Sequence, residues 1–481
     1  MSAPDPVASS QPDAAPQPDA APVTPTRPTA ESSSSPPSAS PAPISGGAPL
    51  PPTPVLPDPV VTLTEERLRP VSRLLATLFV GSTAATLAGV LLFPGGVQVG
   101  VKQFGYSYLV AFMYLSSLLL GSLFWVMIHH LTAAGWSVVL RRLWENNTRA
   151  LPILLLLSAP VITLIPTLYK WADPNAYQHG VHGTIQVAQD PLWLEKQPWL
   201  SPSFFIARLL GYFAIWIYLS TRLADRSQAQ DTTGDSSHNI PMSNMSSWGM
   251  VLLALTTSFF VFDMMMSLDY HWFSTIYGVY FWAGSINCAM ASMVLTVLTL
   301  KSFGILKNTI TIEHLHDMGK IMFGFTVFWT YIGFSQFFLY WYANIPEETL
   351  WYQHRRIGGA FDGNWNSVSW FLFLGRFVIP FFWLLPRSAK RNPTRLAIAA
   401  VWIMFMHYVD LYWQIMPNYQ NSHDHPSGVD GVHLHWMDAT TWIMAVSLAA
   451  LFVVARQWPA RPLIPTGDSK LNESIHHVNH W

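Results

Sequence analysis

Long apolar runs constrain this chain more than any other feature of its sequence. Ten of them follow residue 70, each with about 20 residues or more, the length that an α-helix needs to cross roughly 30 Å of hydrocarbon. We expect these helices at 71–93, 106–131, 149–169, 203–222, 247–268, 273–300, 319–342, 367–386, 396–416 and 437–456. Pro152, Pro160 and Pro166 should kink the third helix or end it early. The predicted fold class is an all-α polytopic membrane protein with ten transmembrane helices.

The composition agrees with this class and excludes others. Hydrophobic residues make up 51% of the 481 residues and charged residues only 11%, whereas soluble domains carry about 25% charged residues. The formal net charge of −1 argues against a nucleic-acid-binding protein that works through bulk basicity. A single cysteine, Cys288, excludes a disulfide framework, a Cys-ligated zinc site and Cys-held iron–sulfur clusters in this chain.

Three segments are expected along the chain. Residues 1–60 hold 18 of the 37 prolines, and the hexapeptide at 11–16 is repeated at 17–22. Such a segment buries too little apolar surface to offset its ordering entropy. We therefore expect a disordered, Pro/Ala/Ser-rich cytoplasmic tail at 1–65, a membrane domain at 66–460 and a short cytoplasmic tail at 461–481.

The basic residues predict an orientation. Ten helices put both termini on one side, and most Lys and Arg residues near the helix ends fall on that side. Five fall on the other: Lys102, Lys170, Lys196, Arg355 and Arg356. The positive-inside rule then places both termini in the cytoplasm. The opposite loops, at 169–202, 343–366 and 417–436, are longer and aromatic, which suits docking to a partner outside.

Ionisable residues inside the expected helices carry the functional signal, since a charge at the bilayer centre costs about 2.5–3.5 kcal/mol on insertion scales. At about 1.5 Å per residue, Arg208, Asp263 and Asp410 should share one layer about 8–9 Å below the outer surface. Arg376 and His407 should lie deeper, near about 14 Å. His129 and His130 end the second helix at the cytoplasmic interface.

These charges have two interpretations. In the first, an Arg–Asp clasp locks the helices together and His407 is hydrogen-bonded in the core. In the second, which charges from four helices favour, they form a proton path or a polar headgroup site. Arg208 would then lie between two carboxylates. His407 would be the next station, because imidazole takes up and releases protons near neutral pH, and His129 would mark the exit.

A haem or a metal centre is not expected in this chain. Most membrane cytochromes hold a b-type haem between two deep histidines, and only His407 is deep here. One outer loop is rich in possible metal ligands, but their spacing matches no closed zinc pattern, so a hydrated or partner-facing loop is favoured. These residues are His423, Asp424, His425, Asp430, His433, His435 and Asp438.

Four stretches resemble a known family. They are Phe259–Gly278 (FFVFDMMMSLDYHWFSTIYG), Gln103–Tyr108 (QFGYSY), Phe334–Tyr342 (FSQFFLYWY) and His407–Trp413 (HYVDLYW). The longest is very similar to the ActF family of NrfD-like membrane subunits of bacterial alternative complex III. The resemblance covers about residues 70–456 and excludes the Pro-rich tail.

The resemblance implies a fold, a set of partners and a function. Family members have ten helices, eight in two four-helix bundles plus two peripheral ones, and ligate no redox cofactor of their own, although a quinone or quinol can bind. They lie in the bacterial inner membrane beside a paralogous NrfD-like subunit (ActC), an extracytoplasmic iron–sulfur subunit, multihaem cytochrome c subunits and small membrane subunits. This complex of respiratory or photosynthetic chains oxidises quinol, and the subunit is expected to support quinol oxidation or proton translocation and to anchor the iron–sulfur and haem c subunits.

The candidates for a proton path or quinone site are Arg208, Asp263, Asp269, His271, Arg376, His407, Asp410 and His129. Asp263, His407 and Asp410 stand within the matching motifs, as do Asp269 and His271, whereas Arg208 and Arg376 rest on the depth argument alone. No catalytic, cofactor-ligating or metal-ligating residue is predicted. Two alternatives stay open: a stand-alone secondary transporter, and the ActC paralogue or a polysulfide-reductase-type membrane anchor. The runs contain no pair of Gly/Pro-broken helices in matching positions of two halves, which argues against the transporter.

Overall fold

The computed structural model describes residue 58 and residues 62–180, 183–355, 364–420, 431–432 and 434–479. The expected Pro-rich tail up to residue 57 therefore lies outside the described residues. Arg356 and most of the candidate metal loop, residues 421–430 and 433, lie outside them as well.

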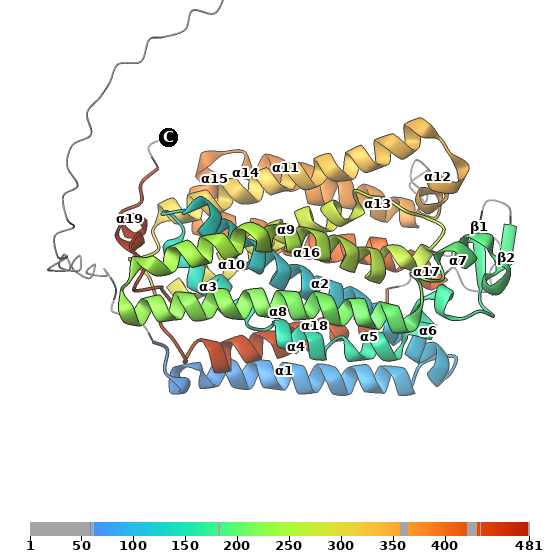
Figure 1. Ribbon diagram of the computed structural model, residues 1–481, viewed down its shortest axis with the longest axis horizontal. Coiled ribbons are helices and arrows are strands. Elements are labelled where there is room, and N and C mark those ends of the chain that lie inside the picture. Colours follow the sequence, from blue (N-terminus) through green and yellow to red (C-terminus); the bar gives the residue numbers. More distant parts are fainter. Residues whose placement is uncertain are drawn as a thin grey trace, which may run out of the picture. The chain divides into compact units, whose positions relative to one another are not determined.

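Nine stretches of helix in the described residues are long and apolar enough to cross a membrane, and they lie side by side along the long axis in Figure 1. Two of them end or pass through π-helical turns, η5 (Leu374–Val378) and η6 (Val453–Gln457). The helices are α1 (Glu65–Leu91), α2 (Val97–Thr132), α8 (Pro202–Thr233), α9 (Asn239–Met264), α10 (Tyr277–Ser302), α11 (Ile312–Ala343), α13 (Trp365–Phe373) continued by η5 and α14 (Ile379–Leu384), α16 (Pro393–Ile415), and α18 (Trp436–Phe452) continued by η6.

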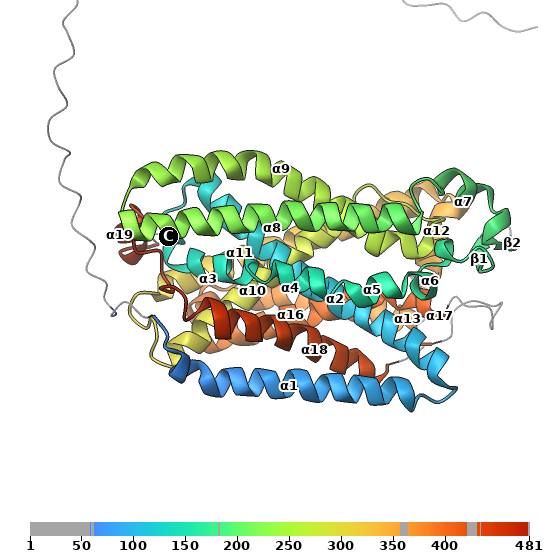
Figure 2. The same ribbon diagram turned by 60° about the horizontal axis from the view of Figure 1, so that its bottom comes forward.

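The third apolar run is not one helix. It forms three short pieces, α4 (Leu151–Leu156), α5 (Ala159–Thr163) and α6 (Ile165–Leu168), each with a proline at its first or second position. A proline fits there because its missing N–H would have no partner in the first turn. The expectation that prolines interrupt this run is confirmed. In Figures 1 and 2 the pieces follow one another beside α8, so the chain still runs along the long axis of the bundle here.

Short elements gather at the two ends of the bundle. One, which we call the hairpin end, carries the antiparallel strands β1 (Tyr177–Gly180) and β2 (Gly183–Gln186), in which Tyr177 pairs with Gln186. It also carries α7 (Pro191–Lys196), α12 (Pro346–Gln353) and α17 (Pro417–Gln420). The opposite end, which we call the α19 end, carries α3 (Val138–Thr148), α15 (Arg387–Arg391) and α19 (Leu471–Ile475). Helix α1 starts at that same end (Figure 1).

Helix α2 is the centre of the bundle. In its most apolar window 94% of the residues are buried, against 17% for the peripheral helix α1. It packs on α9, α10, α16 and α18. At Gly121 an added Cβ would lie 2.5 Å from the carbonyl oxygen of Ser285 on α10, so glycine is what lets these two helices approach. The core is thus built around a helix that its neighbours cover on nearly every side.

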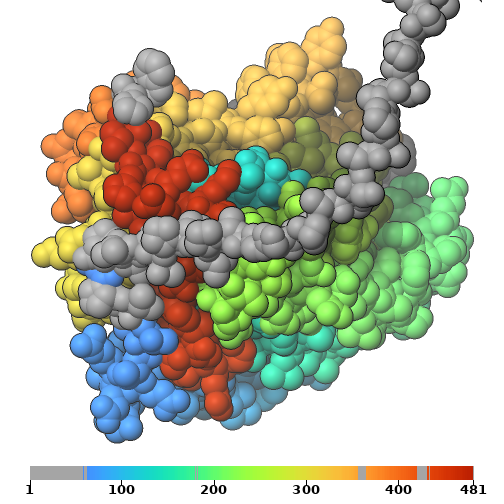
Figure 3. Space-filling model, turned by 60° about the vertical axis from the view of Figure 1, so that its left-hand side comes forward, coloured from blue at the N-terminus to red at the C-terminus, as the bar shows by residue number. Residues whose placement is uncertain are grey.

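Both segments expected as tails make contacts with this bundle. Leu463, Ile464, Leu471 and Ile475 are buried, and the C-terminal segment spreads over the α19 end in Figure 3, where it is red. Before α1, the Asp58 carboxylate accepts hydrogen bonds from the backbone and side chains of Asn308 and Thr309. Segments that precede and follow the expected membrane domain in the sequence therefore pack against it.

Candidate functional site

Arg376, His407 and Asp410 form one buried cluster. Nη1 of Arg376 lies 3.3 Å from Oδ2 of Asp410, and Nη2 donates to Nδ1 of His407 at 2.9 Å. Nη1 also donates to the carbonyl of Met406 at 3.1 Å, and the guanidinium lies 4.3 Å from the ring centre of Trp329. These three site candidates, expected in two separate layers, are therefore in direct contact.

The local backbone explains how an arginine fits in this core. Arg376 lies in the π-helical turn η5, whose extra residue per turn changes the direction of the side chain; such turns are frequent at functional sites. On the facing helix α10, Gly284 leaves the space, because an added Cβ would lie 2.6 Å from Nη2 of Arg376 and 3.1 Å from Cε1 of His407. A π turn and a glycine together make the room for the cluster.

The hydrogen bonds of His407 determine its tautomer. A guanidinium only donates, so Nδ1 of His407 accepts from Arg376 and the ring proton lies on Nε2. Nε2 then donates to Oγ of Ser117 at 2.7 Å, and that hydroxyl donates to the carbonyl of Tyr114 at 2.7 Å. A second ring proton would have to sit on Nδ1, where it would point at the N–H group that Arg376 donates. The expectation that His407 both takes up and releases protons therefore does not fit these contacts while Arg376 stays in place.

Asp410 is the carboxylate of the cluster and interacts with several neighbours. Its Oδ1 accepts from the Tyr280 hydroxyl at 2.6 Å, and its Oδ2 faces Arg376. A carboxylate has about four acceptor positions. The side chains of Trp329 and Gln414 also lie close enough to act on this carboxylate, and Oε1 of Gln414 is buried with no hydrogen-bond partner among the described residues. Asp410 therefore lies beside a buried side-chain oxygen that has no partner in the described part of the chain.

Arg208 and Asp263 form a separate pair that is saturated. The guanidinium bonds the carboxylate through Nε (2.9 Å) and Nη2 (2.8 Å), and Tyr212 and Trp199 donate to the same carboxylate at 2.9 and 3.2 Å. No hydrogen bond or ion pair joins Arg208 to Asp410 in the described part of the chain. The expected arrangement of Arg208 between two carboxylates is therefore wrong. The geometry is that of a clasp between α8 and α9.

Asp269 and His271 lie in a cluster at the hairpin end. Oδ1 of Asp269 accepts from the Gln178 side chain at 3.0 Å, and Nε2 of His271 lies 2.5 Å from Oδ2 of Asp190. Burial alone would raise the pKa of Asp190, but hydrogen bonds from His271 and Tyr270 outweigh it and hold that pKa below its usual value. The cluster ties the hairpin segment to the end of α9 and lies apart from Asp410.

His129 belongs to a charge network at the α19 end. Its Nε2 lies 3.1 Å from Nη1 of Arg141, and its Nδ1 lies 2.8 Å from Oγ of Ser137. Arg141 also pairs with Glu145 at 3.1 Å and with Asp468 at 2.5 Å, and all are buried. No continuous chain of hydrogen bonds joins His129 to His407 in the described residues; the hydroxyls of Ser285 and Thr330, for example, donate to carbonyls of their own helices.

Sequence reasoning missed Tyr280, Asp190 and Asp468, which complete the three clusters. Tyr280 is one of many aromatic residues and carries no distinguishing signal. Asp190 precedes Pro191 and caps α7 by accepting from the backbone of Leu192 at 3.0 Å, a pattern that the Asp-Pro pair could have indicated. Of the outer loop that is rich in possible metal ligands and is interpreted above as hydrated or partner-facing, His435 and Asp438 are described; they cap the start of α18, and Asp438 accepts from Ser107 at 2.5 Å. No group of three possible metal ligands occurs among the described residues.

The apolar helices and the buried charges between them define an all-α, multi-pass membrane protein. Comparison with protein-family models and with curated protein sequences finds no match to this chain.

Proposed function

We propose that this chain is a membrane subunit of a quinol-oxidising electron-transfer complex of the alternative complex III type, and that Asp410 is a station on its proton path. The observation that carries the proposal is the buried set Tyr280–Asp410–Arg376–His407, in which a carboxylate is held in the core between a hydroxyl and a guanidinium. Arg376 compensates the charge of Asp410, which lets a carboxylate persist at this depth. The motif around His407 and Asp410 is also one of those that resemble the ActF family.

The same proposal assigns the architecture and the partners. The chain crosses the bacterial inner membrane ten times, with the third crossing made by α4–α6, and both termini lie in the cytoplasm. The α19 end faces the cytoplasm, in line with the basic residues gathered there. The hairpin end faces outward and anchors the iron–sulfur and multihaem cytochrome c subunits, with the ActC-like paralogue and small subunits alongside. Redox cofactors belong to those partners.

A quinol site is the second role open to the cluster. A cavity of about 340 Å³ lies between α10, α16 and α18, lined by Tyr114, Tyr408, Trp442 and apolar side chains. The Tyr114 ring, 5.6 Å from the His407 ring centre, separates this cavity from the cluster. An apolar cavity bordered by hydroxyls suits a quinone head group. Quinol oxidation and proton movement must therefore be measured separately.

The test uses Asp410→Asn and His407→Phe in the assembled complex, with Asp263→Asn as the matched control from the saturated clasp. A proton path predicts that Asp410→Asn abolishes proton movement while quinol oxidation continues. Equal loss of both activities would favour a quinol site. Wild-type behaviour of both Asp410 and His407 variants would refute any functional role for the cluster. Asp263→Asn should lower stability and leave the ratio of protons to electrons unchanged.

One observation favours a different class, a secondary transporter. The third apolar run is broken into α4–α6, and the eighth passes through the π turn η5, which contains Gly375 and is followed by Pro380. These are matching positions when ten crossings are divided into halves, so the sequence argument against a transporter no longer holds. The discriminating experiment is detergent purification with a haem stain. Co-purifying multihaem bands favour the complex, whereas a chain that purifies alone and moves a solute into proteoliposomes favours the transporter.

A further inference from the structure

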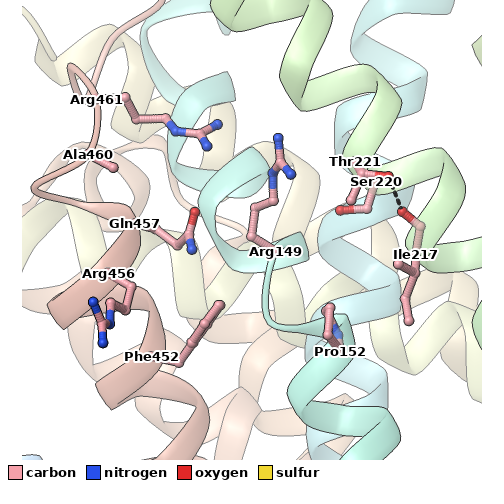
Figure 4. A pocket seen from close by; sticks show the side chains of 10 residues that line it. All are labelled: Arg149, Pro152, Ile217, Ser220, Thr221, Phe452, Arg456, Gln457, Ala460 and Arg461. Carbon is pink, nitrogen blue, oxygen red and sulfur yellow. Dashed lines mark hydrogen bonds between the residues drawn. The ribbon is translucent and has the colours of Figure 1, made fainter.

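A basic pocket lies between three helices toward the α19 end. Its volume is about 350 Å³, and it opens between the junction of α3 and α4, the middle of α8 and the end of α18 (Figure 4). Three arginines line it together with hydroxyl, amide and apolar groups. The lining residues are Arg149, Pro152, Ile217, Ser220, Thr221, Phe452, Arg456, Gln457, Ala460 and Arg461.

Several polar atoms of this pocket have no partner within the described residues. Nε and Nη1 of Arg461 are buried without a hydrogen bond, and the whole residue is only 8% exposed. Oγ of Ser220 and Nε of Arg149 are unsatisfied in the same way. The Thr221 hydroxyl, in contrast, donates to the carbonyl of Ile217 at 2.6 Å, the dashed line in Figure 4. Buried donors left in this state destabilise a fold unless a ligand or water accepts from them.

The charges in the pocket do not balance. Arg149 pairs with the exposed carboxylate of Asp225. No carboxylate of the described residues lies within ion-pair distance of Arg456 or Arg461. Burial lowers the pKa of Arg461, and the nearby Arg149 and Arg142 lower it further, only partly opposed by Glu145 and Asp225. An arginine stays charged in spite of such a shift, so an anion at this position would relieve the repulsion.

The surroundings of the pocket indicate the kind of anion. Phe452, Ile217 and Pro152 form an apolar wall. Phe452 and Ile217 belong to two of the long apolar helices, and Pro152 belongs to the interrupted third apolar run. Arg456 and Gln457 end the last long helix, and the exposed Arg222 follows the pocket on α8. The pocket thus lies where apolar helix surface gives way to charge, the level of lipid phosphates. Guanidinium forks and a hydroxyl are suited to phosphate oxygens.

We propose that this pocket binds the phosphate group of an anionic phospholipid. The phosphate oxygens accept from Nε and Nη1 of Arg461, from Nε of Arg149 and from the Ser220 hydroxyl. Arg456 supplies further positive charge, and the acyl chains lie along Phe452 and Ile217. Inorganic phosphate offers the same acceptor oxygens without the chains, so the experiment separates the two sources.

The experiment uses the full chain, with whatever assembles with it, purified in mild detergent. Native mass spectrometry with stepwise delipidation measures retention of added phosphatidylglycerol against phosphatidylcholine. We expect the wild type to keep one phosphatidylglycerol. Arg461→Gln and Ser220→Ala should each weaken its binding by about tenfold, the effect of losing a hydrogen bond to a charged group. The control is Arg222→Gln, which removes an exposed arginine from α8 outside the pocket and should bind as the wild type does.

A second arm titrates delipidated protein with inorganic phosphate. Saturable phosphate binding that depends on Arg461, without preference for phosphatidylglycerol, would uphold the phosphate site with the free ion as its occupant. Equal lipid retention by the wild type, Arg461→Gln and Ser220→Ala, together with no saturable phosphate binding, would overturn the proposal. Arg461→Lys is the control for misfolding, because it keeps the positive charge and loses only the guanidinium fork. Its phosphatidylglycerol binding should lie between that of the wild type and that of Arg461→Gln.

Discussion

The guanidinium of Arg376 donates to Nδ1 of His407 at 2.9 Å, and this one bond assigns the ring proton to Nε2. The histidine is thereby a donor toward Ser117. His407 on α16 therefore accepts a hydrogen bond from Arg376 of the adjacent π turn and donates one to Ser117. His407 holds Arg376 in position, and Arg376 in turn faces the carboxylate of Asp410.

A methyl group placed at Gly284 should displace this cluster. In Gly284→Ala the new Cβ would lie 2.6 Å from Nη2 of Arg376, so a buried guanidinium must shift. We expect a loss of about 1–3 kcal/mol of stability, as for other overpacked cores, measured as a lower Tm. Gly324→Ala on α11 is the control, because its Cβ would meet nothing within 4 Å. An unchanged Tm in Gly284→Ala would contradict the packing described for Arg376.

The Arg208–Asp263 clasp should behave as a structural pair. Asp263→Ala leaves a buried guanidinium without its carboxylate, which costs about 3–5 kcal/mol in comparable pairs. The double variant Arg208→Met/Asp263→Leu removes both charges and should recover much of that loss. Denaturation in detergent measures the cycle. If Asp263→Ala were as stable as the wild type, the pair would contribute nothing to holding α8 against α9.

The Asp190–His271 contact should make the hairpin end sensitive to acid. The folded-state pKa of Asp190 lies below its usual 3.8, so its stabilising contribution is complete above that value and is lost as the pH falls through the folded pKa. We expect the protection of amides in residues 183–196, measured against the intrinsic exchange rate at the same pH, to fall over that acid range, and Asp190→Asn to show less protection already at neutral pH. Asp173→Asn, in the same loop, serves as the control. Identical pH profiles for wild type and Asp190→Asn would rule out this contact as the cause.

Asp468 should stabilise the α19 end through Arg141. Asp468→Asn leaves Arg141 with Glu145 but without its 2.5 Å partner, in a site where the arginine is 1% exposed. We expect a loss of about 2–5 kcal/mol, typical of a buried charge pair that loses one member. Glu473→Gln, an exposed acid on α19, is the matched control and should change the Tm little. Equal Tm values for the two variants would show that Asp468 does not carry the pairing.

The membrane helices were predictable because length and apolar content decide whether a segment can cross a bilayer. The pairing of the buried charges was not. Depth along a helix places Arg208 and Asp410 at one level, but contact also requires that their helix faces meet, and hydropathy says little about rotation around the axis. Arg376 adds a second difficulty, since a π turn shifts its side chain away from the direction that an α-helical repeat predicts.

The C-terminal segment escaped prediction for another reason. Residues 461–475 contain few apolar side chains, so composition indicates a tail, and their burial depends on charges far away in the chain. Asp468 bonds Arg141, and the Ser474 hydroxyl donates to the carbonyl of Trp136 at 2.8 Å. Pairings of this range are not visible in any local window of sequence.

The two residues of the Arg141–Asp468 pair are translated at very different times. Arg141 is translated before α4, whereas Asp468 emerges only after α18. During all of the intervening insertion steps the arginine lacks one of its two carboxylates, and α3 can reach its final, fully paired state only once the segment after α18 has been made. A segment translated after the last long helix therefore completes a site whose first residues are made near the start of the helical region.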